Sequence, residues 1–293
     1  MPDELVTALL GRPQLRVVVA TTAELSREAR ELQHAQAASA ALLAQGLTAA
    51  VLVAALQKGK ARINLQLECD GPLRGFFADA AASGEVRGYV KNAAVAVENA
   101  GEFRWRPALG NSGFLSVLRD LGRGEYYRSS VELTAFDLQA DLEHYFALSE
   151  QLEAAVSLST CREGSEALAG VAGVLIQPLP EGDRDELARL REALSTKRPL
   201  DAALRARPGG SAANLLKQLF PRDDVEVMAQ VPLQFRCDCS LERVLKALVV
   251  LGAAELSDMI QTEGHAEVRC EFCSRRYEVS RAELETLRDG LTA

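Results

Sequence analysis

The chain has 293 residues, more than one small domain needs, so we expect two domains or one domain with an appendage. Hydrophobic residues make up 48% and charged residues 25%, a balance that argues against global disorder. The 33 basic and 41 acidic residues give a net charge of -8, which disfavours a protein that binds nucleic acid mainly through its phosphates.

No segment of the sequence has the length of a membrane span. The longest apolar run, residues 47–56, covers ten residues, whereas a span needs about 18–20. The first residues are acidic early and lack the basic and apolar regions of a signal peptide. We therefore expect a cytoplasmic protein that does not bind membranes, in a reducing compartment where structural disulfides are unusual.

Residues 1–180 are predicted to form an α+β domain, because strands and helices are segregated along the chain. A β-branched run over 15–20 is typical of a buried strand, and Thr22 is placed to cap a helix over 23–34. The Ala-rich stretch 36–57 is apolar nearly all round and predicts a buried helix. Further strands are expected over 61–69, 74–80, 86–90, 114–118, 126–134, 153–160 and 170–178, with a helix after Asp137.

Residues 181–231 differ in composition from the first 180 residues. They are heavily charged, with nine acidic and nine basic residues. Asp183 and Ser211 are placed to cap helices, and Pro199 to open a short one. These helical pieces fall below the ~12–15 residues at which an isolated helix is marginal in water. Two interpretations stay open: a helical connector packed on the first domain, or a metastable linker that is folded only while its neighbours hold it.

Residues 232–293 are predicted to form a small C-terminal domain. Ser280 and Glu283 have the spacing of a capping box that starts a terminal helix. Because the region carries few apolar side chains, we expect its fold to need a staple beyond its core. Helices are expected over 240–251 and near 254–260, and short strands over 266–268 and 277–279.

Four of the six cysteines can form that staple, since they fall in two close pairs, Cys237-Asp-Cys239 and Cys270-Glu-Phe-Cys273. Two pairs of thiolates can close a tetrahedral shell around Zn²⁺, and these four residues are the predicted ligands of one zinc ion. An iron–sulfur cluster is less favoured, because the pairs lack ferredoxin-type spacings. His265, one of only three histidines, is not needed as a ligand.

Three roles of such a cluster differ in class. It can be purely structural, it can belong to a nucleic-acid module, which the acidic balance and 5% aromatic content disfavour, or it can be a redox switch. A disulfide within C-x-C closes a very small ring and should be labile. Oxidation would remove a zinc-binding term of roughly 10–16 kcal/mol, more than the ~5–15 kcal/mol stability of a typical domain.

The flanking arginines can act on the cluster. A zinc site of four thiolates carries a formal negative charge, which Arg236, Arg269, Arg275 and Arg276 could offset while favouring thiolate over thiol. The alternative is that these arginines are ordinary solvated surface residues.

Outside the cluster, the chain carries no recognisable catalytic motif: no Walker loop, no dinucleotide-binding fingerprint and no nucleophile elbow. Cys69 is predicted to pack in the core, and Cys161, next to Arg162, is either structural or redox-active. The main alternative function is a zinc-stabilised thiol–disulfide oxidoreductase. Against it, no thioredoxin-like βαβ pattern surrounds Cys270.

The paired cysteines resemble those of the bacterial 33 kDa chaperonin family, the redox-regulated heat-shock chaperones. The resemblance covers nearly the whole chain and includes QLECDGP over 66–72, YFALSEQL over 145–152 and GVLIQPLP over 173–180. One departure is Ser274, where glycine is common in the family.

The resemblance implies an ATP-independent holdase, a chaperone rather than an enzyme, which binds unfolded client proteins during oxidative stress. It implies that the reduced, zinc-bound protein is inactive. Oxidation would then form the disulfides Cys237–Cys239 and Cys270–Cys273, release zinc, unfold the C-terminal domain and destabilise the linker. Active members of the family associate as homodimers.

Overall fold

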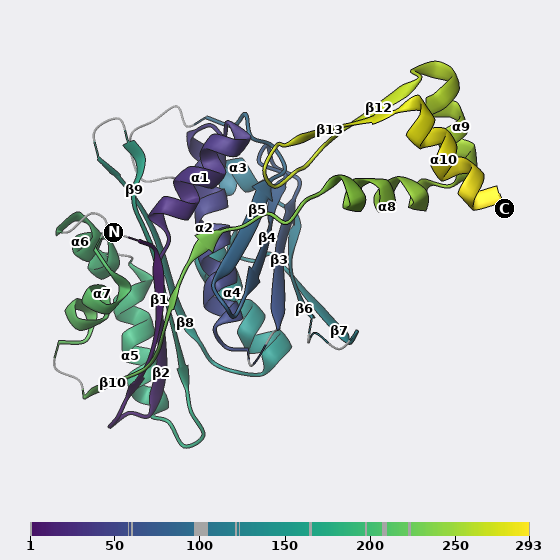
Figure 1. Ribbon diagram of the computed structural model, residues 1–293. Helices are drawn as coiled ribbons and strands as arrows, with labels where there is room; N and C mark the ends of the chain where they lie inside the picture. Colours follow the sequence, from purple (N-terminus) through teal and green to yellow (C-terminus); the bar gives the residue numbers. More distant parts are fainter. Residues whose placement is uncertain are drawn as a thin grey trace. The chain divides into compact units, whose positions relative to one another are not determined.

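The computed structural model describes the chain except residues 1, 58, 60, 97–104, 121, 123, 164–165, 197, 207–209, 222–223 and 293. It forms two compact units, Met1–Arg236 and Cys237–Ala293 (Figure 1). The stretch 181–231, read from the sequence as a linker, belongs to the first unit. Its sheets and helices confirm the predicted α+β class.

Two sheets organise the first unit. The five-stranded sheet is antiparallel, with the strand order β10-β1-β2-β9-β8. The six-stranded sheet has the order β11-β5-β4-β3-β6-β7, and only its β11 runs parallel to its neighbour. The first sheet comprises β1 Glu4–Leu10, β2 Leu15–Thr21, β8 Ala155–Glu163, β9 Glu166–Pro178 and β10 Val225–Pro232; the second comprises β3 Arg62–Cys69, β4 Gly75–Ala81, β5 Glu85–Val90, β6 Gly113–Asp120, β7 Tyr126–Glu132 and β11 Gln234–Phe235.

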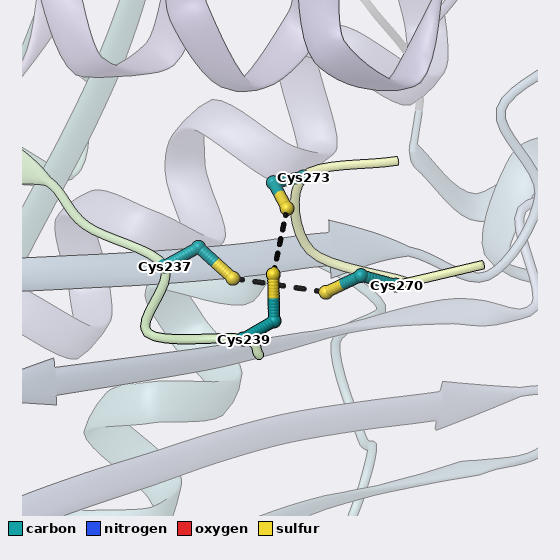
Figure 2. Close-up of side chains that lie close together, drawn as sticks. All are labelled: Cys237, Cys239, Cys270 and Cys273. Atoms are coloured by element: carbon teal, nitrogen blue, oxygen red, sulfur yellow. Dashed lines mark hydrogen bonds between the residues drawn. The ribbon is translucent and has the colours of Figure 1, made fainter. Parts of the chain in front are cut away.

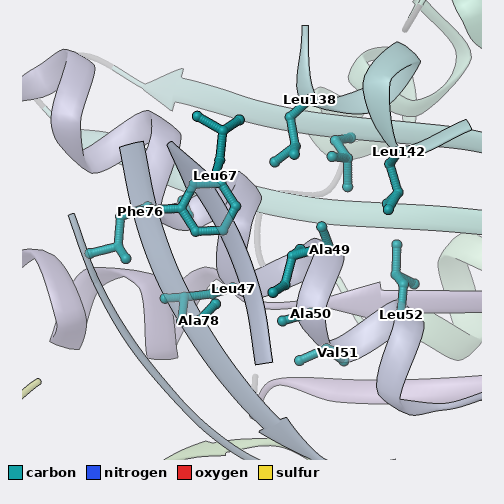
Figure 3. Close-up of a cluster of buried hydrophobic side chains, with 14 of the residues drawn as sticks. Leu47, Ala49, Ala50, Val51, Leu52, Leu67, Phe76, Ala78, Leu138 and Leu142 are labelled. Atoms are coloured by element: carbon teal, nitrogen blue, oxygen red, sulfur yellow. The ribbon is translucent and has the colours of Figure 1, made fainter. Parts of the chain in front are cut away.

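Helix α2, Ala37–Ala54, packs against both sheets and is therefore buried nearly all round, as its composition predicts. Its side chains meet those of β4 in the main core (Figure 3). Gly46 permits this approach, because a Cβ there would lie 2.5 Å from the ring of Phe76. The core is completed by α1 Ala23–Gln33, α3 Trp105–Leu109, and α4 Leu138–Tyr145 with the π-helical turn Phe146–Glu150 that follows it.

Among the described residues, α2 is the one helix long and apolar enough to cross a membrane. Its most apolar window is 89% buried inside the protein. The hydropathy of α2 is thus that of a core helix.

The opposite face of the five-stranded sheet carries a second core. Helices α5 Arg184–Ser195, α6 Arg198–Ala206 and α7 Ala212–Leu219 cover it. Strand β2 lies between the two cores: Val17 and Val19 face the helices, while Val18 and Ala20 face α2. This double burial explains why 17–20 reads as a continuous apolar run.

The N-caps of three helices test the predictions made from single residues. Asp183 and Ser211 cap α5 and α7 as predicted. Thr22 stands at the N-cap of α1 but makes no capping bond, because its hydroxyl pairs with that of Thr48 at 2.6 Å. The carboxylate of Asp3 instead accepts the hydrogen bond of the Leu25 amide at 2.7 Å. The expectation that Thr22 caps α1 by its own side chain is therefore wrong.

Four elements of the first unit were not foreseen: β1, α3, β10 and β11. The interpretation of 181–231 as helical is wrong for its last residues, which form most of β10. That strand pairs with β1, and most of its side chains are exposed, so it has no buried face to give an apolar period.

The second unit is small. It contains α8 Leu241–Leu251, α9 Ala253–Thr262, α10 Arg281–Thr292 and the hairpin of β12 His265–Arg269 with β13 Arg276–Ser280. The predicted capping box is present, since the Glu283 carboxylate accepts from the Ser280 amide at 2.8 Å and the Ser280 hydroxyl accepts from the Glu283 amide at 3.4 Å. The apolar core consists of Leu248, Leu256, Ile260, Ala266, Val279 and Leu284, with partly buried neighbours.

Candidate metal centre

The hairpin of the second unit places one pair of cysteines. Cys270 and Cys273 lie in the turn between β12 and β13. The turn is closed by hydrogen bonds from the Cys270 amide to the Arg275 carbonyl, 2.9 Å, and from the Ser274 amide to the Cys270 carbonyl, 2.8 Å. Ser274 has a φ of 58°, the left-handed conformation that favours glycine.

The other pair lies just before α8. Cys237 and Cys239 occupy an irregular stretch, and Ser240 then caps the helix by accepting a hydrogen bond from the Arg243 amide at 3.3 Å. The cap fixes where the helix begins and leaves both cysteines outside it. The backbone of Cys237 and Cys239 can therefore bend so that both sulfurs point towards one metal ion.

All four sulfurs converge within the second unit (Figure 2). They lie within 4.8 Å of one another, with Cys237 Sγ 3.7 Å from Cys270 Sγ and Cys239 Sγ 3.3 Å from Cys273 Sγ. Zinc bound by four sulfurs at ~2.3 Å would hold them about 3.8 Å apart. The donor set and its spacing therefore fit one tetrahedral metal ion, and all four cysteines are free thiols.

Tyr277 is a functional neighbour that the sequence analysis did not single out. From β13, its hydroxyl donates a hydrogen bond to Cys239 Sγ at 3.1 Å. Burial raises the pKa of Cys239, but this bond and those from the other thiols outweigh it and lower the pKa to about 7. For Cys237, burial and hydrogen bonds donated to its neighbours raise the pKa to about 12. A tyrosine four residues past the last cysteine, on the returning strand, is the signal that could have revealed it.

The flanking arginines divide into two kinds. Arg236 pairs with Glu85 in the first unit at 2.7 Å, Arg276 pairs with Glu267 at 3.0 Å, and Arg269 donates to the Ser274 hydroxyl at 2.8 Å. For Arg275, a hydrogen bond to Tyr277 and the nearby Cys239 and Cys273 thiolates raise the pKa. The charge of Arg275 therefore interacts with the cluster.

The remaining candidates lie away from the four sulfurs. Cys69 is half-buried against the main core and Cys161 is buried in the second core of the first unit. Burial raises the pKa of both thiols, which keeps them protonated and unreactive. His265 is exposed, and its Nδ1 lies 3.1 Å from the Glu263 carbonyl oxygen. It is not a member of the sulfur cluster.

Comparison with known proteins gives this geometry a context. The family model described as "Hsp33 protein" matches residues 3–280. The chain belongs to the Hsp33 family. Relatives named "33 kDa chaperonin" include those of Geobacter sulfurreducens, 37% identical over 99% of this chain and 96% of the relative, and Gloeobacter violaceus, 36% identical over 99% and 97%.

The fold is similar along its whole length to a solved member of the Hsp33 family. The crystal structure of the 33 kDa chaperonin from Thermotoga maritima matches with a TM-score of 0.80 and 28% identity, over 99% of both chains. The predicted resemblance is therefore confirmed, and the relatives carry the name of a chaperone rather than of an enzyme.

Proposed function

We propose that the protein is a redox-regulated, ATP-independent holdase that binds unfolded proteins and prevents their aggregation. The four converging sulfurs carry the proposal, and the Hsp33 family supports the chaperone part of it. We assign three functional regions: an α+β chaperone domain over 1–180, a metastable linker over 181–231 and a redox domain over 232–293.

In the reduced state, Cys237, Cys239, Cys270 and Cys273 would hold one Zn²⁺. An all-thiolate set suits this ion, which stabilises small folds by crosslinking them. The second unit needs that crosslink, since its apolar core has only six buried side chains. A binding term of roughly 10–16 kcal/mol exceeds what so small a core provides.

Oxidation would reverse this stabilisation. One peroxide takes two electrons from a pair of thiolates and two protons from solvent, leaving one disulfide and two water molecules. Two such reactions consume all four ligands, so the metal is released and the second unit unfolds. Reductants of the cytoplasm would return the thiols and restore the zinc-bound state.

We assign the disulfides to Cys237–Cys239 and Cys270–Cys273. In the folded unit, sulfur contacts of 3.7 Å and 3.3 Å run between the pairs. Pairing is decided after unfolding, when the shortest loops have the highest effective concentration. Peptide mapping tests this assignment, and mainly crossed bridges such as Cys237–Cys270 would contradict it.

Unfolding of the second unit would then destabilise the linker helices α5, α6 and α7. They are short, and their stability comes from docking Leu187, Leu194 and Leu216 on the five-stranded sheet. Undocking exposes these side chains and the sheet face beneath them, which offers apolar surface to unfolding clients. Active molecules would associate as homodimers, as the family resemblance implies.

The decisive experiment measures bound metal, free thiols and aggregation suppression on the same samples before and after peroxide. We expect one zinc and six free thiols before oxidation, without suppression. After oxidation we expect no zinc, two free thiols and stoichiometric suppression of the aggregation of a thermally unfolding protein. Catalytic turnover of a small disulfide, without suppression, would instead favour the thiol–disulfide oxidoreductase.

A further inference from the structure

One short segment closes an edge in each of the two sheets of the first unit. This edge segment, residues 224–236, contains β10 and β11. β10 is the outermost strand beside β1 (Figure 1), and β11 is the outermost strand beside β5. Without the edge segment, β1 and β5 would both present unpaired backbone amides and carbonyls.

Backbone contacts dominate the hold on the edge segment. The Leu233 amide donates to the Asp3 carbonyl at 2.9 Å, the Gln234 amide to the Gly84 carbonyl at 3.0 Å, and the Arg236 amide to the Val86 carbonyl at 2.8 Å. A Cβ on Gly84 would lie 2.1 Å from the Pro232 carbonyl oxygen, so the two backbones lie in direct contact.

Along β10, Val225 and Val231 pack against the two cores and Gln230 donates to Glu4, but most of the side chains are exposed. Val227 is 52% exposed and Met228 is 62% exposed, and of the eight residues of β10 none is buried. Where main-chain hydrogen bonds supply the affinity, an extended chain of almost any sequence can take the strand's place. The edge segment thus shows what fits the two edges: a polypeptide in extended conformation.

Both ends of the edge segment join parts of the chain that would unfold on oxidation: the linker helices before it and the second unit after it. Its first residue follows α7 of the linker, separated by a short connection, and its last residue precedes Cys237 directly. The ion pair of Arg236 with Glu85 and the two-residue strand β11 hold the end of the edge segment, next to the second unit that begins at Cys237. Unfolding on both sides leaves the edge segment without a folded anchor at either end.

We propose that β1 and β5 form a strand-acceptor site for unfolded polypeptide, which the edge segment occupies until oxidation releases it. This inference rests on the proposed holdase function and assigns it a client surface. Unfolded clients expose unpaired backbone groups whatever their sequence, so strand addition explains how one site can accept many of them.

A peptide with the sequence of residues 224–236 tests the site. Labelled with a fluorophore, it should bind the oxidised full-length protein and not the zinc-bound protein, and a reduced, carboxymethylated, permanently unfolded protein should displace it. The matched control carries N-methyl groups on the amides of Leu233, Gln234 and Arg236 and keeps every side chain. Because it cannot donate these three bonds, we expect at least tenfold weaker binding.

Hydrogen exchange on the full chain provides the second readout. Amides of 4–10 and 85–86, the residues that pair with the edge segment, should lose protection on oxidation and regain it when the unfolded protein binds. Amides of β7, the opposite edge of the six-stranded sheet, should not change. Equal competition by the methylated peptide, or no recovery of protection at β1 and β5, would overturn the proposal. Recovery without client that rises with protein concentration would also overturn it, by assigning the edges to a second copy of this chain.

Aggregation suppression measured on the same samples separates the two proposals. Suppression without peptide binding refutes the strand-acceptor site and leaves the holdase function standing. Peptide binding without suppression supports the strand-acceptor edges and refutes the holdase function.

Discussion

The two units of the chain achieve stability by different means. The first unit buries large aliphatic and aromatic side chains on both faces of its five-stranded sheet, around the apolar helix α2 and under the linker helices. The second unit has six buried apolar residues and four sulfurs that meet at one point. Oxidation of those sulfurs should destabilise the second unit, because its fold depends on them. It should leave the first unit stable, because burial of apolar side chains does not depend on redox state.

Under the proposed function, this difference puts the redox switch and the client-binding surface in separate parts of the chain. A sensor has to unfold at a modest chemical signal, whereas a binding platform has to survive it. The linker helices and the edge segment belong to the first unit in the fold. In the sequence, they are the last part of the chain before the second unit. The following predictions test whether stability is divided in this way.

The largest effect is expected from removing half of the sulfur cluster. The double variant Cys270→Ser with Cys273→Ser should lose zinc and, with it, a stabilisation of about 10–16 kcal/mol in the second unit. Far-UV circular dichroism should show the loss of its helices. Trp105, the single tryptophan of the chain, lies in the main core and should keep its fluorescence and its melting transition.

The matched control for that variant is His265→Ala, which should keep the full zinc content because four sulfurs complete the shell. Retention of zinc by the double cysteine variant would contradict the ligand assignment. A change in the Trp105 transition would show that the two units do not divide stability as described.

A smaller effect should come from weakening the linker alone. Leu216 is 1% exposed in the second core, and Leu216→Ala should cost about 2–5 kcal/mol of docking energy. We expect activation at lower temperature or peroxide concentration, with unchanged zinc affinity. Hydrogen exchange of α5 to α7 measures the opening, and exposed Lys217→Ala is the control. An unchanged activation threshold would show that undocking does not limit activation.

The first unit should also carry a pH dependence of its own. Burial raises the pKa of Asp3 to about 6, so the folded state binds its proton more tightly than the unfolded state does. Stability should therefore fall by roughly 2–3 kcal/mol as the pH rises from about 4 to about 6, and level off above. Denaturation followed by Trp105 fluorescence should show this fall in the native chain and not in Asp3→Asn. Parallel profiles would contradict it.

The sequence predicts well wherever a pattern is local. The alternation of Ile63, Leu65 and Leu67 identifies β3, and the spacing of the four cysteines predicts the sulfur cluster that could hold a metal ion. Caps made by a neighbouring residue, such as Ser280 with Glu283, were also predicted correctly. In each case the interacting groups lie within a few residues, so their spacing is visible in the chain.

Prediction fails where a partner is distant in sequence. β10 is held by backbone bonds to β1, more than 200 residues away, and shows no apolar period. The cap of α1 comes from Asp3 and not from Thr22, because Thr22 bonds to Thr48 of α2. Tyr277 reads as an ordinary strand residue until the hairpin brings it to Cys239. No local spacing encodes the pairing of β10 or the bonds of Thr22 and Asp3.

The smallest effect concerns Ser274, in the turn between β12 and β13. Ser274 has a φ of 58°, a conformation that costs a non-glycine residue of order 1 kcal/mol, and its hydroxyl accepts a hydrogen bond from Arg269. Ser274→Gly relieves the backbone strain and loses the hydrogen bond from Arg269. That bond is exposed to solvent and therefore weak. We expect the zinc-bound second unit to gain up to about 1 kcal/mol, measured as slower zinc release to a chelator, while the Trp105 transition stays unchanged. Ser274→Ala keeps the strain and loses the bond, so it should release zinc faster than the native chain. If glycine also released zinc faster, the hydrogen bond from Arg269 would be the larger of the two terms.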